Sequence, residues 1–413
     1  MNILFLTIGR FASIEAHSIY ADLLRCFRDH GHEIYTITPY EKKTGKKTEL
    51  VHEKGAHILH IETGNVTGAN NLISKGIAQV SLEPTFIRAI KQYFSDVKFD
   101  LVMYSTPPIT FSKAVEFVKK RDGAKSYLLL KDIFPQNAVD LGMMTKTGAK
   151  GYIYKYFRRQ EKKLYKLSDC IGCMSEANVK YVIDHNPEVD PEKVEVCPNS
   201  VEVIDQSVDA ETRKQIREKY GIPLNKKVFI YGGNLGKPQG IPFLIECLRK
   251  AKNIEDAYFL IIGSGNEYGK LQSFFEQEKP NNVKLLSLLP KEDYDSMVGA
   301  CDVGLIFLDH RFTIPNFPSR LLAYMQAKLP VLACTDPNTD IGKVIVDGGF
   351  GWWCESNRVD FFILKIHEII KSTNVEKMKM NCFTILEKEF SVEKSYEIIT
   401  KSLRRQTETW DRN

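Results

Sequence analysis

The sequence predicts an α/β protein made of two successive doubly wound parallel sheets. Continuous apolar runs alternate with amphipathic runs through short links, as in a parallel sheet covered by helices. The alternation restarts after about residue 207. The chain of 413 residues is also longer than one ordinary hydrophobic core accommodates, which favours two domains.

The first half of the chain supplies the first sheet. The run "NILFLTI" at residues 2–8 is apolar throughout, as in a strand buried on both faces of a parallel sheet. Residues 18–32 have the apolar period of an amphipathic helix, and Gly31 is expected to close it. Further strands are expected at residues 33–40, 99–108, 125–135 and 169–175, and a further helix at residues 110–120.

The second half repeats the pattern after a hinge near residues 200–207. Strands are expected at residues 226–233, 257–265, 282–289, 302–308 and 330–335. Helices are expected at residues 209–222, 241–251, 270–278, 292–301 and 321–327, and the segment 341–349 completes the series. We therefore predict an amino-terminal domain at residues 1–203, a second domain at residues 204–385 and a helical tail at residues 386–413 that packs back on the first domain. Ligands of such sheets bind at the carboxyl ends of the strands, here in the cleft between the two domains.

Composition and charge exclude several classes of protein. Apolar residues make up 43% and charged residues 26% of the chain, as in globular proteins, and no apolar run approaches the roughly 18–20 residues that span a bilayer. The first residues lack a basic segment and a cleavage signal, so we expect a cytoplasmic protein. A net charge of +5 is too mild to indicate nucleic-acid binding.

The nine cysteines are scattered singly, as expected for reduced and buried thiols. Cys170 and Cys173 have the spacing of a redox motif, but "CIGCM" has the composition of a buried strand and no second pair is available for zinc. Structural thiols are therefore the favoured interpretation.

Two glycine-rich loops stand where a strand gives way to a helix in the second half. "YGGNLGKPQGI" at residues 231–241 and "IIGSGNEYGKL" at residues 261–271 let backbone amides approach a phosphate closely. Neither has the spacing of a Walker loop or of the dinucleotide fingerprint. Tight structural turns explain one such loop as well as a ligand does, but two loops in one domain favour a diphosphate.

A helix start in "NFPSRLLAYMQ" adds a third feature of this kind. Ser319 is expected to cap the helix at residues 321–327 with its hydroxyl. The first turn of a helix offers free N–H donors, and Arg320 adds a planar cation that matches phosphate. We expect an anion at this helix start.

The second-half segments "YGGNLGKPQGI", "IIGSGNEYGKL", "YDSMVGACDVGLIFL" and "NFPSRLLAYMQAKLPVLA" resemble, in this order, the donor lobe of family 4 glycosyltransferases. These are retaining enzymes of the GT-B architecture, in which two Rossmann-like lobes face each other across a nucleotide-sugar cleft. "SIYADLLRCFRDHGHEI", "YSTPP" and "LLLKDIFPQNAVDLGMM" resemble the branch that builds bacterial capsular polysaccharide, O-antigen and exopolysaccharide units. The resemblance covers roughly residues 1–390.

The resemblance implies a donor site for a nucleotide sugar, most simply UDP-linked, without a metal ion or another cofactor. Arg320 and Lys237 would stabilise the leaving diphosphate, and no Asp-x-Asp motif of the kind that seats a metal stands out. The residues that would hold the donor are Gly233, Asn234, Gly236, Gly263, Ser264, Gly265, Asn316, Phe317 and Ser319.

The resemblance also implies a retaining transfer in which the acceptor hydroxyl attacks as the phosphate leaves. A hydrolase should instead show two carboxylates that flank the bond, and nothing in the sequence singles out such a pair. The implied acceptor is a saccharide linked to polyprenyl pyrophosphate.

His17 and Asp132 are the candidates on the acceptor side. His17 lies near the entrance of the first helix and Asp132 at the end of the strand "YLLLKD". Asp132 would bind an acceptor hydroxyl or orient the donor sugar. The alternatives are a surface or packing histidine and a turn aspartate that caps local amides.

The segment at residues 146–166 has eight basic residues, one acidic residue and four tyrosines. A basic, aromatic amphipathic helix fits the surface of an anionic membrane, which would present a lipid-linked acceptor. The alternative is a solvated helix face over the core, and RNA binding is disfavoured because no nucleic-acid module accompanies the segment. The residues expected to face the membrane are Lys155, Arg158, Arg159, Lys162 and Lys163.

The sequence departs from the family at several site positions. Ala323 replaces an expected ribose-binding glutamate, Pro315 stands at the partner position eight residues earlier, and Lys328 replaces the usual helix-ending glycine. Asn234 and Gln239 replace basic residues of the glycine loop. Two alternatives therefore stay open: a non-catalytic homologue that binds a glycan or supports a partner enzyme, and a UDP-sugar epimerase of the same fold.

Overall fold

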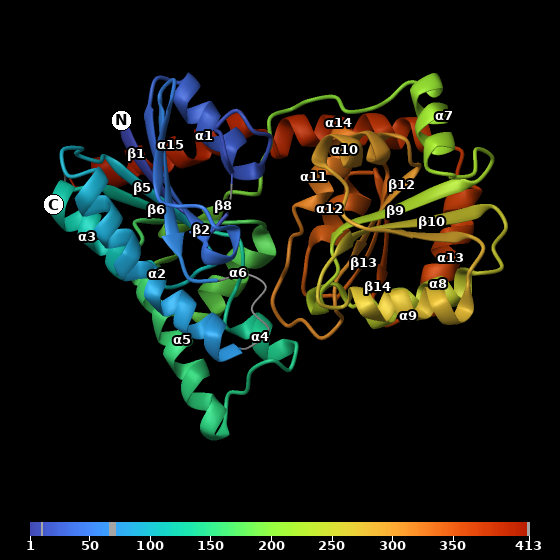
Figure 1. Cartoon of the computed structure of the whole chain (residues 1–413), viewed down its shortest axis with the longest axis horizontal. Coiled ribbons are helices and arrows are strands. Elements are labelled where there is room, and N and C mark those ends of the chain that lie inside the picture. Colours follow the sequence, from blue (N-terminus) through green and yellow to red (C-terminus); the bar gives the residue numbers. More distant parts are fainter. Residues whose placement is uncertain (10, 66–71, 411–413) are drawn as a thin grey trace. The chain divides into compact units, whose positions relative to one another are not determined.

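The computed structural model describes residues 1–9, 11–65 and 72–410. The chain divides into two compact units, one formed by Met1–Glu202 with Ser391–Asn413 and the other by Val203–Phe390. These divisions lie within a few residues of the expected domain limits at 203 and 385. The last helix belongs to the first unit although it follows the second unit in the chain (Figure 1).

The first unit is built on a sheet that has eight strands within the described residues, in the order β3-β4-β2-β1-β5-β6-β7-β8. All neighbouring strands are parallel except β3 and β4, which form an antiparallel pair at one edge. The strands are β1 (Asn2–Leu6), β2 (Glu33–Glu41), β3 (Glu49–Glu53), β4 (Ala56–Thr63), β5 (Leu101–Ser105), β6 (Lys125–Leu130), β7 (Cys170–Cys173) and β8 (Val194–Val196).

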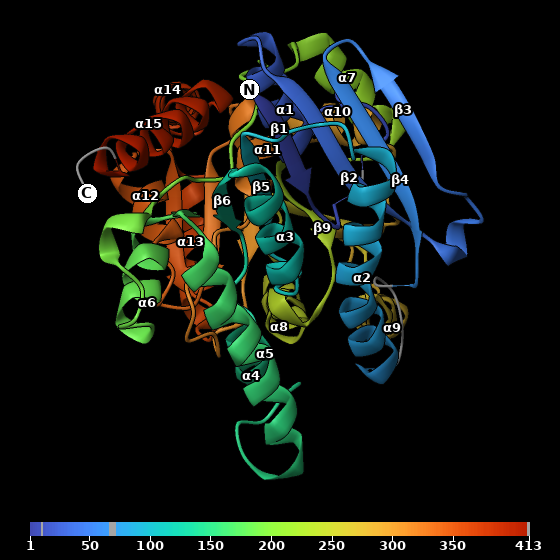
Figure 2. The ribbon, with the colours of Figure 1, turned by 90° about the vertical axis from the view of Figure 1, so that its left-hand side faces the viewer.

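Helices cover both faces of this sheet, and two apolar clusters fill the space beneath them. One cluster joins the sheet to α2, α3, α5 and α6, and the other joins it to α1 and α15. Figure 2 shows α2, α3 and α5 in front of the strands. The helices are α1 (Ile19–Asp29), α2 (Leu72–Tyr93), α3 (Ser112–Asp122), α4 (Gln136–Asp140), α5 (Gly148–Leu167), α6 (Glu176–His185) and α15 (Val392–Trp410), with short 3₁₀ turns η1 (Lys42–Thr44) and η2 (Pro191–Lys193).

The second unit has a parallel sheet with six strands within the described residues, in the order β11-β10-β9-β12-β13-β14. The strands are β9 (Lys227–Asn234), β10 (Ala257–Ser264), β11 (Val283–Leu286), β12 (Val303–Phe307), β13 (Val331–Thr335) and β14 (Gly351–Glu355). One apolar cluster packs α8, α9 and α13 on the sheet. The helices are α7 (Ala210–Lys219), η3 (Lys237–Gln239), α8 (Ile241–Ala251), α9 (Tyr268–Glu278), α10 (Lys291–Gly299), α11 (Arg320–Gln326), α12 (Ile341–Asp347), α13 (Val359–Ile370) and α14 (Val375–Glu389).

The expected strands and helices are present in order, and the two parallel sheets confirm the predicted α/β fold class. The nine cysteines are free and buried, as expected. The β3–β4 pair, α2, β14 and α13 were not expected from the sequence. Within the described residues, no helix is long and apolar enough to cross a membrane.

Candidate functional site

The strand order of the second unit defines where a ligand can bind. From β9 the chain continues to β10 and β11 on one side and then returns to β12 on the other side. Parallel pairing between β9 and β12 is limited to Phe229–Val303 and Ile230–Gly304, although both strands continue beyond this point. Such a switch point at the carboxyl ends of parallel strands is the usual ligand position of a doubly wound sheet.

The two glycine loops lie side by side at this edge. The register of β9 and β10 pairs Gly233 with Gly263 and Asn234 with Ser264. Gly233 has a φ of +117°, which only glycine adopts without strain. A Cβ on Gly263 would lie 1.9 Å from the Gly233 carbonyl oxygen, so this pairing requires glycine. The sequence had predicted both loops, but it did not show that they are neighbours.

Gln239 closes the first loop on itself. Its Oε1 accepts hydrogen bonds from the Gly236 amide at 3.1 Å and from the Asn234 Nδ2 at 3.1 Å. The Gly236 amide therefore bonds within the loop in this structure, and its contact with a donor stays a prediction. Lys237 is exposed at the start of η3, while Ser264 and Gly265 are exposed at the end of β10.

Arg320 lies over β9, where the two strands diverge. Its Cζ is 4.2 Å from the ring centroid of Tyr231, and its Nη2 would lie 3.6 Å from a Cβ placed on Gly233. The Tyr231 hydroxyl donates to the Asn234 carbonyl at 2.8 Å, so one tyrosine holds both the guanidinium and the glycine loop. The Arg320 Nη1 is buried and has no hydrogen-bond partner among the described residues.

Asn316 carries a second buried donor without a partner in the part of the chain that the structure describes, its Nδ2. The segment that holds it is braced from the end of β13: Thr339 Oγ1 donates to the Asn316 carbonyl at 2.5 Å, and Asn338 Nδ2 donates to the Phe312 carbonyl at 2.6 Å. Asp336 accepts from the Asn338 and Thr339 amides, and burial raises the pKa of its carboxyl to about 6. Neither these bracing contacts nor the role of Tyr231 was expected from the sequence.

The helix start differs from expectation in one respect. Helix α11 begins at Arg320, and Ser319 precedes it in a helical conformation without a hydrogen bond from its side chain to the first turn. The predicted hydroxyl cap is therefore wrong, because the exposed Ser319 already has helical backbone angles. Phe317 is buried and stacks on Phe390, with ring centroids 5.9 Å apart.

Lys328 occupies a conformation that suits the glycine it replaces. Its φ is +53°, in the left-handed region. Its Nζ pairs with Asp205 at 2.5 Å and lies 4.7 Å from the ring centroid of Phe383. The left-handed region strains any residue with a Cβ, and these two contacts are ones that glycine could not make.

Asp132 lies at the carboxyl end of β6 in the first unit. Its two carboxylate oxygens each lie 2.8 Å from Asn137 Nδ2, and its backbone amide donates to Thr106 Oγ1 at 3.1 Å. Burial raises the pKa of the Asp132 carboxyl to about 6, although the bond from Asn137 favours the charged form. The neighbouring Lys131 is also partly buried, which lowers the pKa of its ammonium group.

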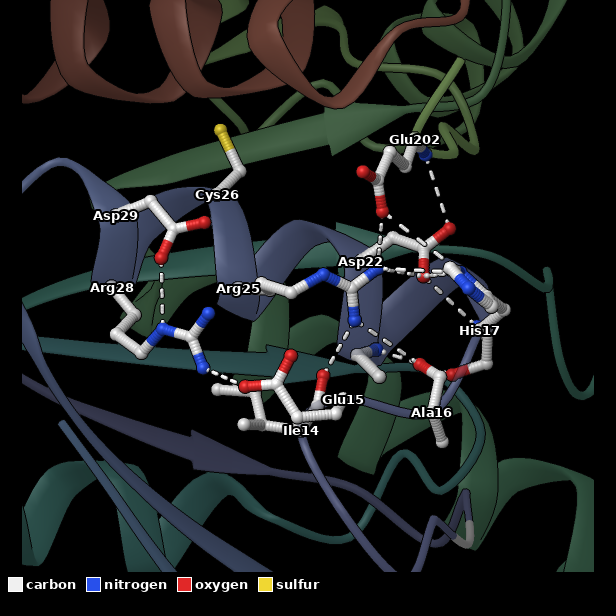
Figure 3. A network of polar contacts seen from close by, with 12 residues as sticks. Ile14, Glu15, Ala16, His17, Asp22, Arg25, Cys26, Arg28, Asp29 and Glu202 are labelled. Atoms are coloured by element: carbon white, nitrogen blue, oxygen red, sulfur yellow. Dashed lines mark hydrogen bonds and ion pairs between the residues drawn. The ribbon is translucent and has the colours of Figure 1, made fainter. Parts of the chain in front are cut away.

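His17 belongs to a different network from Asp132. Figure 3 shows it beside Asp22, Arg25 and Glu202, with Nδ1 3.7 Å from Asp22 and 3.9 Å from Glu202. The Arg25 guanidinium lies between both carboxylates and also donates to the Ile14 carbonyl at 2.6 Å. The contacts of His17 and those of Asp132 share no residue, so the structure does not join the two predicted acceptor residues.

Helix α5 separates its predicted membrane residues into two groups. Arg158 is wrong as a membrane-facing residue, because it pairs with the buried Glu161 at 2.6 Å and donates to Asn186 Oδ1 at 2.6 Å. Lys155, Arg159, Lys162 and Lys163 are exposed, and Lys162 pairs with Glu188 at 2.9 Å.

Large apolar side chains accompany these cations near the start of α5. Tyr152 is 76% and Ile153 52% exposed, and Tyr156 is also exposed. Figure 2 shows the first turns of α5 projecting beyond the sheet of the first unit. Phe157 and Leu164 on the same helix are buried, so the exposed apolar side chains are confined to its first turns.

A cavity of about 580 Å³ in the second unit contains none of the predicted site residues. Its lining includes Arg213, Asp302, Lys328 and Phe383. Arg213 and Asp302 pair with each other at 2.5 Å, and Lys328 pairs with Asp205. Its charged groups are thus already satisfied, in contrast to Arg320 and Asn316.

Two family models match the chain, one for each unit. Residues 18–203 match Glycosyltransferase Family 4, and residues 212–382 match Glycosyl transferases group 1. Together they leave only the ends of the chain and a short link unmatched.

Individual proteins similar to this chain agree with these matches. The probable glycosyltransferase WbjE of Pseudomonas aeruginosa is 27% identical over 296 residues, which are 70% of each chain. An Escherichia coli UDP-Gal:alpha-D-GlcNAc-diphosphoundecaprenol alpha-1,3-galactosyltransferase is 24% identical over 248 residues, 56% of this chain and 61% of that protein. The structure of Anabaena HepE in complex with UDP has a TM-score of 0.67 at 16% identity, covering 98% of this chain and 100% of HepE.

Proposed function

Because this chain belongs to the family 4 glycosyltransferases of GT-B fold, we propose that it transfers a sugar, with retention of configuration, from a UDP-linked donor to a lipid-linked saccharide. The proposed pathway is the assembly of a bacterial surface polysaccharide. The activity of the undecaprenol-linked galactosyltransferase of Escherichia coli supports the acceptor class, and the UDP bound to HepE supports the donor nucleotide.

The observation that carries this proposal is the pair of buried donors without partners, Arg320 Nη1 and Asn316 Nδ2. A buried polar group that lacks a hydrogen bond costs about 1–3 kcal/mol, so such groups mark places where a ligand completes the bonding. Arg320 faces the glycine loop at the switch point of the sheet, where a diphosphate can also receive backbone amides.

These residues suit the leaving group of the proposed reaction. As the bond between the sugar and the β-phosphate breaks, negative charge builds on the departing UDP. Preorganised donors and cations lower the barrier most effectively where that charge develops. Arg320 supplies a fixed planar cation and Lys237 a mobile one, which together would neutralise the diphosphate without a metal ion.

The acceptor hydroxyl attacks the anomeric carbon on the face that the diphosphate leaves. Its proton passes to the departing β-phosphate oxygen, so that the products are the retained glycoside and UDP. Asp132 is proposed to orient the acceptor or the donor sugar through its carboxylate, with Asn137 fixing the position of both carboxylate oxygens.

We further propose that the start of α5 lies on an anionic membrane of the cytoplasmic side. Exposed Tyr152 and Ile153 would enter the interface, while Lys155 and Arg159 would meet anionic headgroups. Such docking would bring a polyprenyl-linked acceptor to the enzyme. Co-sedimentation with anionic vesicles tests it, and equal binding by Lys162→Glu with Lys163→Glu would argue against an electrostatic contribution from this face.

A thermal-shift screen of nucleoside diphosphates, followed by an assay of UDP release with membrane extract, tests the function. We expect UDP to raise the unfolding temperature of the wild-type protein and of Arg249→Ala, a control at an exposed pair with Glu278. No stabilisation by any nucleoside diphosphate would refute the donor site. Stabilisation without transfer would indicate a non-catalytic homologue, and conversion of the UDP-sugar without an acceptor would indicate an epimerase.

A further inference from the structure

A cluster of cysteine, histidine and glutamate side chains joins α1 to α15 in the first unit. Cys26 and His30 stand one helical turn apart on α1, and Glu393 lies in the first turn of α15. The Cys26 Sγ is 3.5 Å from Glu393 Oε1, and the His30 Nε2 is 3.5 Å from Glu393 Oε2. One potential ligand atom from each of the three residues lies within 4.8 Å of the other two.

The two separations to Glu393 match those of a tetrahedral metal centre, and the third pair of ligand atoms lies within 4.8 Å. Zinc lies about 2.3 Å from sulfur and about 2.0–2.1 Å from nitrogen or oxygen, so tetrahedral ligand atoms are about 3.3–3.6 Å apart. Cysteine, histidine and carboxylate are also the ligand types that zinc prefers. The geometry therefore requires only small side-chain movements to hold an ion.

The orientation of His30 supports metal ligation. Its Nδ1 lies 2.9 Å from the Cys26 carbonyl oxygen, which can only accept, so Nδ1 carries the proton. The neutral ring then presents the lone pair of Nε2 toward Glu393. In zinc sites, the other ring nitrogen of a ligating histidine commonly donates to a backbone carbonyl or a carboxylate, which fixes the tautomer.

The second cluster of this kind in the first unit provides a contrast. His17, Asp22 and Glu202 are equally close to one another, but the Arg25 guanidinium lies 2.9 Å from Asp22 and 2.7 Å from Glu202. A cation already occupies that centre. Figure 3 shows the Cys26 side chain pointing away from this guanidinium. Within the described residues, no side-chain cation contacts the thiol, the imidazole or the carboxylate of the Cys26 cluster.

We propose that Cys26, His30 and Glu393 bind a zinc-type divalent cation, with water as the fourth ligand. On binding, the Cys26 thiol loses its proton to solvent and the S–H bond is replaced by a bond between sulfur and the metal. Burial and the Glu393 carboxylate raise the pKa of this thiol in the absence of metal, and a bound dication reverses that balance.

The proposed ion would fasten the last helix of the chain to the first unit. Glu393 belongs to the segment that returns to this unit after the second unit, 367 residues from Cys26. The His30 and Glu393 side chains are 39% and 63% exposed, which gives an ion access from solvent. None of the site's three residues belongs to the set proposed for sugar transfer, so loss of the ion should change the stability of the first unit rather than the chemistry of transfer.

Zinc retention by the full-length protein tests this proposal. The protein is incubated with Zn²⁺, desalted and analysed for metal, and its thermal unfolding is compared with and without Zn²⁺. We expect one retained zinc per chain and a higher unfolding temperature, with no such effect of Mg²⁺. Co²⁺ in place of zinc should give thiolate-to-metal charge-transfer absorption that is lost in Cys26→Ser.

Variants of the exposed ligands His30 and Glu393 test zinc binding separately from folding, because Cys26→Ser replaces a buried residue and can destabilise the core. Glu393→Gln and His30→Gln should each weaken zinc binding at least about tenfold. Glu397→Gln, which removes an exposed carboxylate one turn further along α15, should leave it unchanged. Absence of zinc retention by the wild-type protein, or equal retention by Glu393→Gln, His30→Gln and the control, would overturn the proposal.

Discussion

Replacing Arg320 by lysine or alanine separates the two contributions that the structure assigns to its side chain. Lysine keeps the positive charge but lacks the planar group that lies 4.2 Å from the Tyr231 ring centroid. It also loses the fixed direction of Nη1, the buried donor without a partner among the described residues. Alanine removes the charge as well.

The magnitudes follow from these contacts. A hydrogen bond to a charged group contributes about 1.5–3 kcal/mol, so Arg320→Lys should lower kcat by roughly 10- to 100-fold. Arg320→Ala also removes charge that faces the leaving diphosphate. Loss of one donor of this kind costs about 2.7–4 kcal/mol, which predicts a decrease of roughly 100- to 1,000-fold.

Steady-state measurement of UDP release tests this order, with the thermal unfolding of each variant as a check on the fold. Tyr231→Phe is the matched variant, because it keeps the ring beneath the guanidinium and removes the hydroxyl that donates to the Asn234 carbonyl. It should reduce kcat less than Arg320→Lys does. Unchanged kinetics in Arg320→Ala, with the fold intact, would show that the diphosphate binds elsewhere.

Three further predictions concern other parts of the chain. Burial raises the Asp132 pKa from 3.8 to about 6, so the wild-type protein loses stability as the pH rises through this range. Asp132→Asn does not titrate, so its free energy of unfolding should increase by about 1 kcal/mol relative to that of the wild type between pH 5 and pH 7.5. Equal unfolding temperatures of the two proteins at both pH values would contradict this. Lys328→Gly and Lys328→Ala both lose the side-chain contacts, but only glycine adopts the left-handed backbone without strain. The unfolding temperature of Lys328→Gly should therefore be about 2–4 °C higher than that of Lys328→Ala, and the reverse order would argue against strain. Tyr152→Ser with Ile153→Ser should weaken co-sedimentation with anionic vesicles at least about tenfold at low salt, and unchanged binding would place the membrane contact elsewhere.

The sequence predicted the order of the strands better than the contacts of the site. Apolar runs such as residues 228–231 and 257–262 are buried on both faces of a sheet, and burial on both faces makes the whole run apolar. The segment 351–355 has two tryptophans and alternating burial, a weaker signal, and was not assigned as the strand β14. The antiparallel edge strand β3 has no fully buried residue and carries little apolar signal.

Side-chain partners depend on register and on rotamers, which spacing alone does not reveal. The pairing of Gly233 with Gly263 follows from the alignment of β9 and β10. The Gln239 side chain accepts a hydrogen bond from the Gly236 amide because the turn η3 directs this side chain toward the loop. Arg158 was assigned to the surface by its charge, but Glu161 lies one turn away on the same helix and draws it inward.

A structure of the protein with UDP in the presence of EDTA would show directly whether these residues hold the leaving diphosphate without a metal ion. We expect the diphosphate within hydrogen-bond distance of Arg320 Nη1, Asn316 Nδ2 and the backbone amides beside Gly233. UDP bound away from these groups, or bound only when a divalent cation is added, would contradict it.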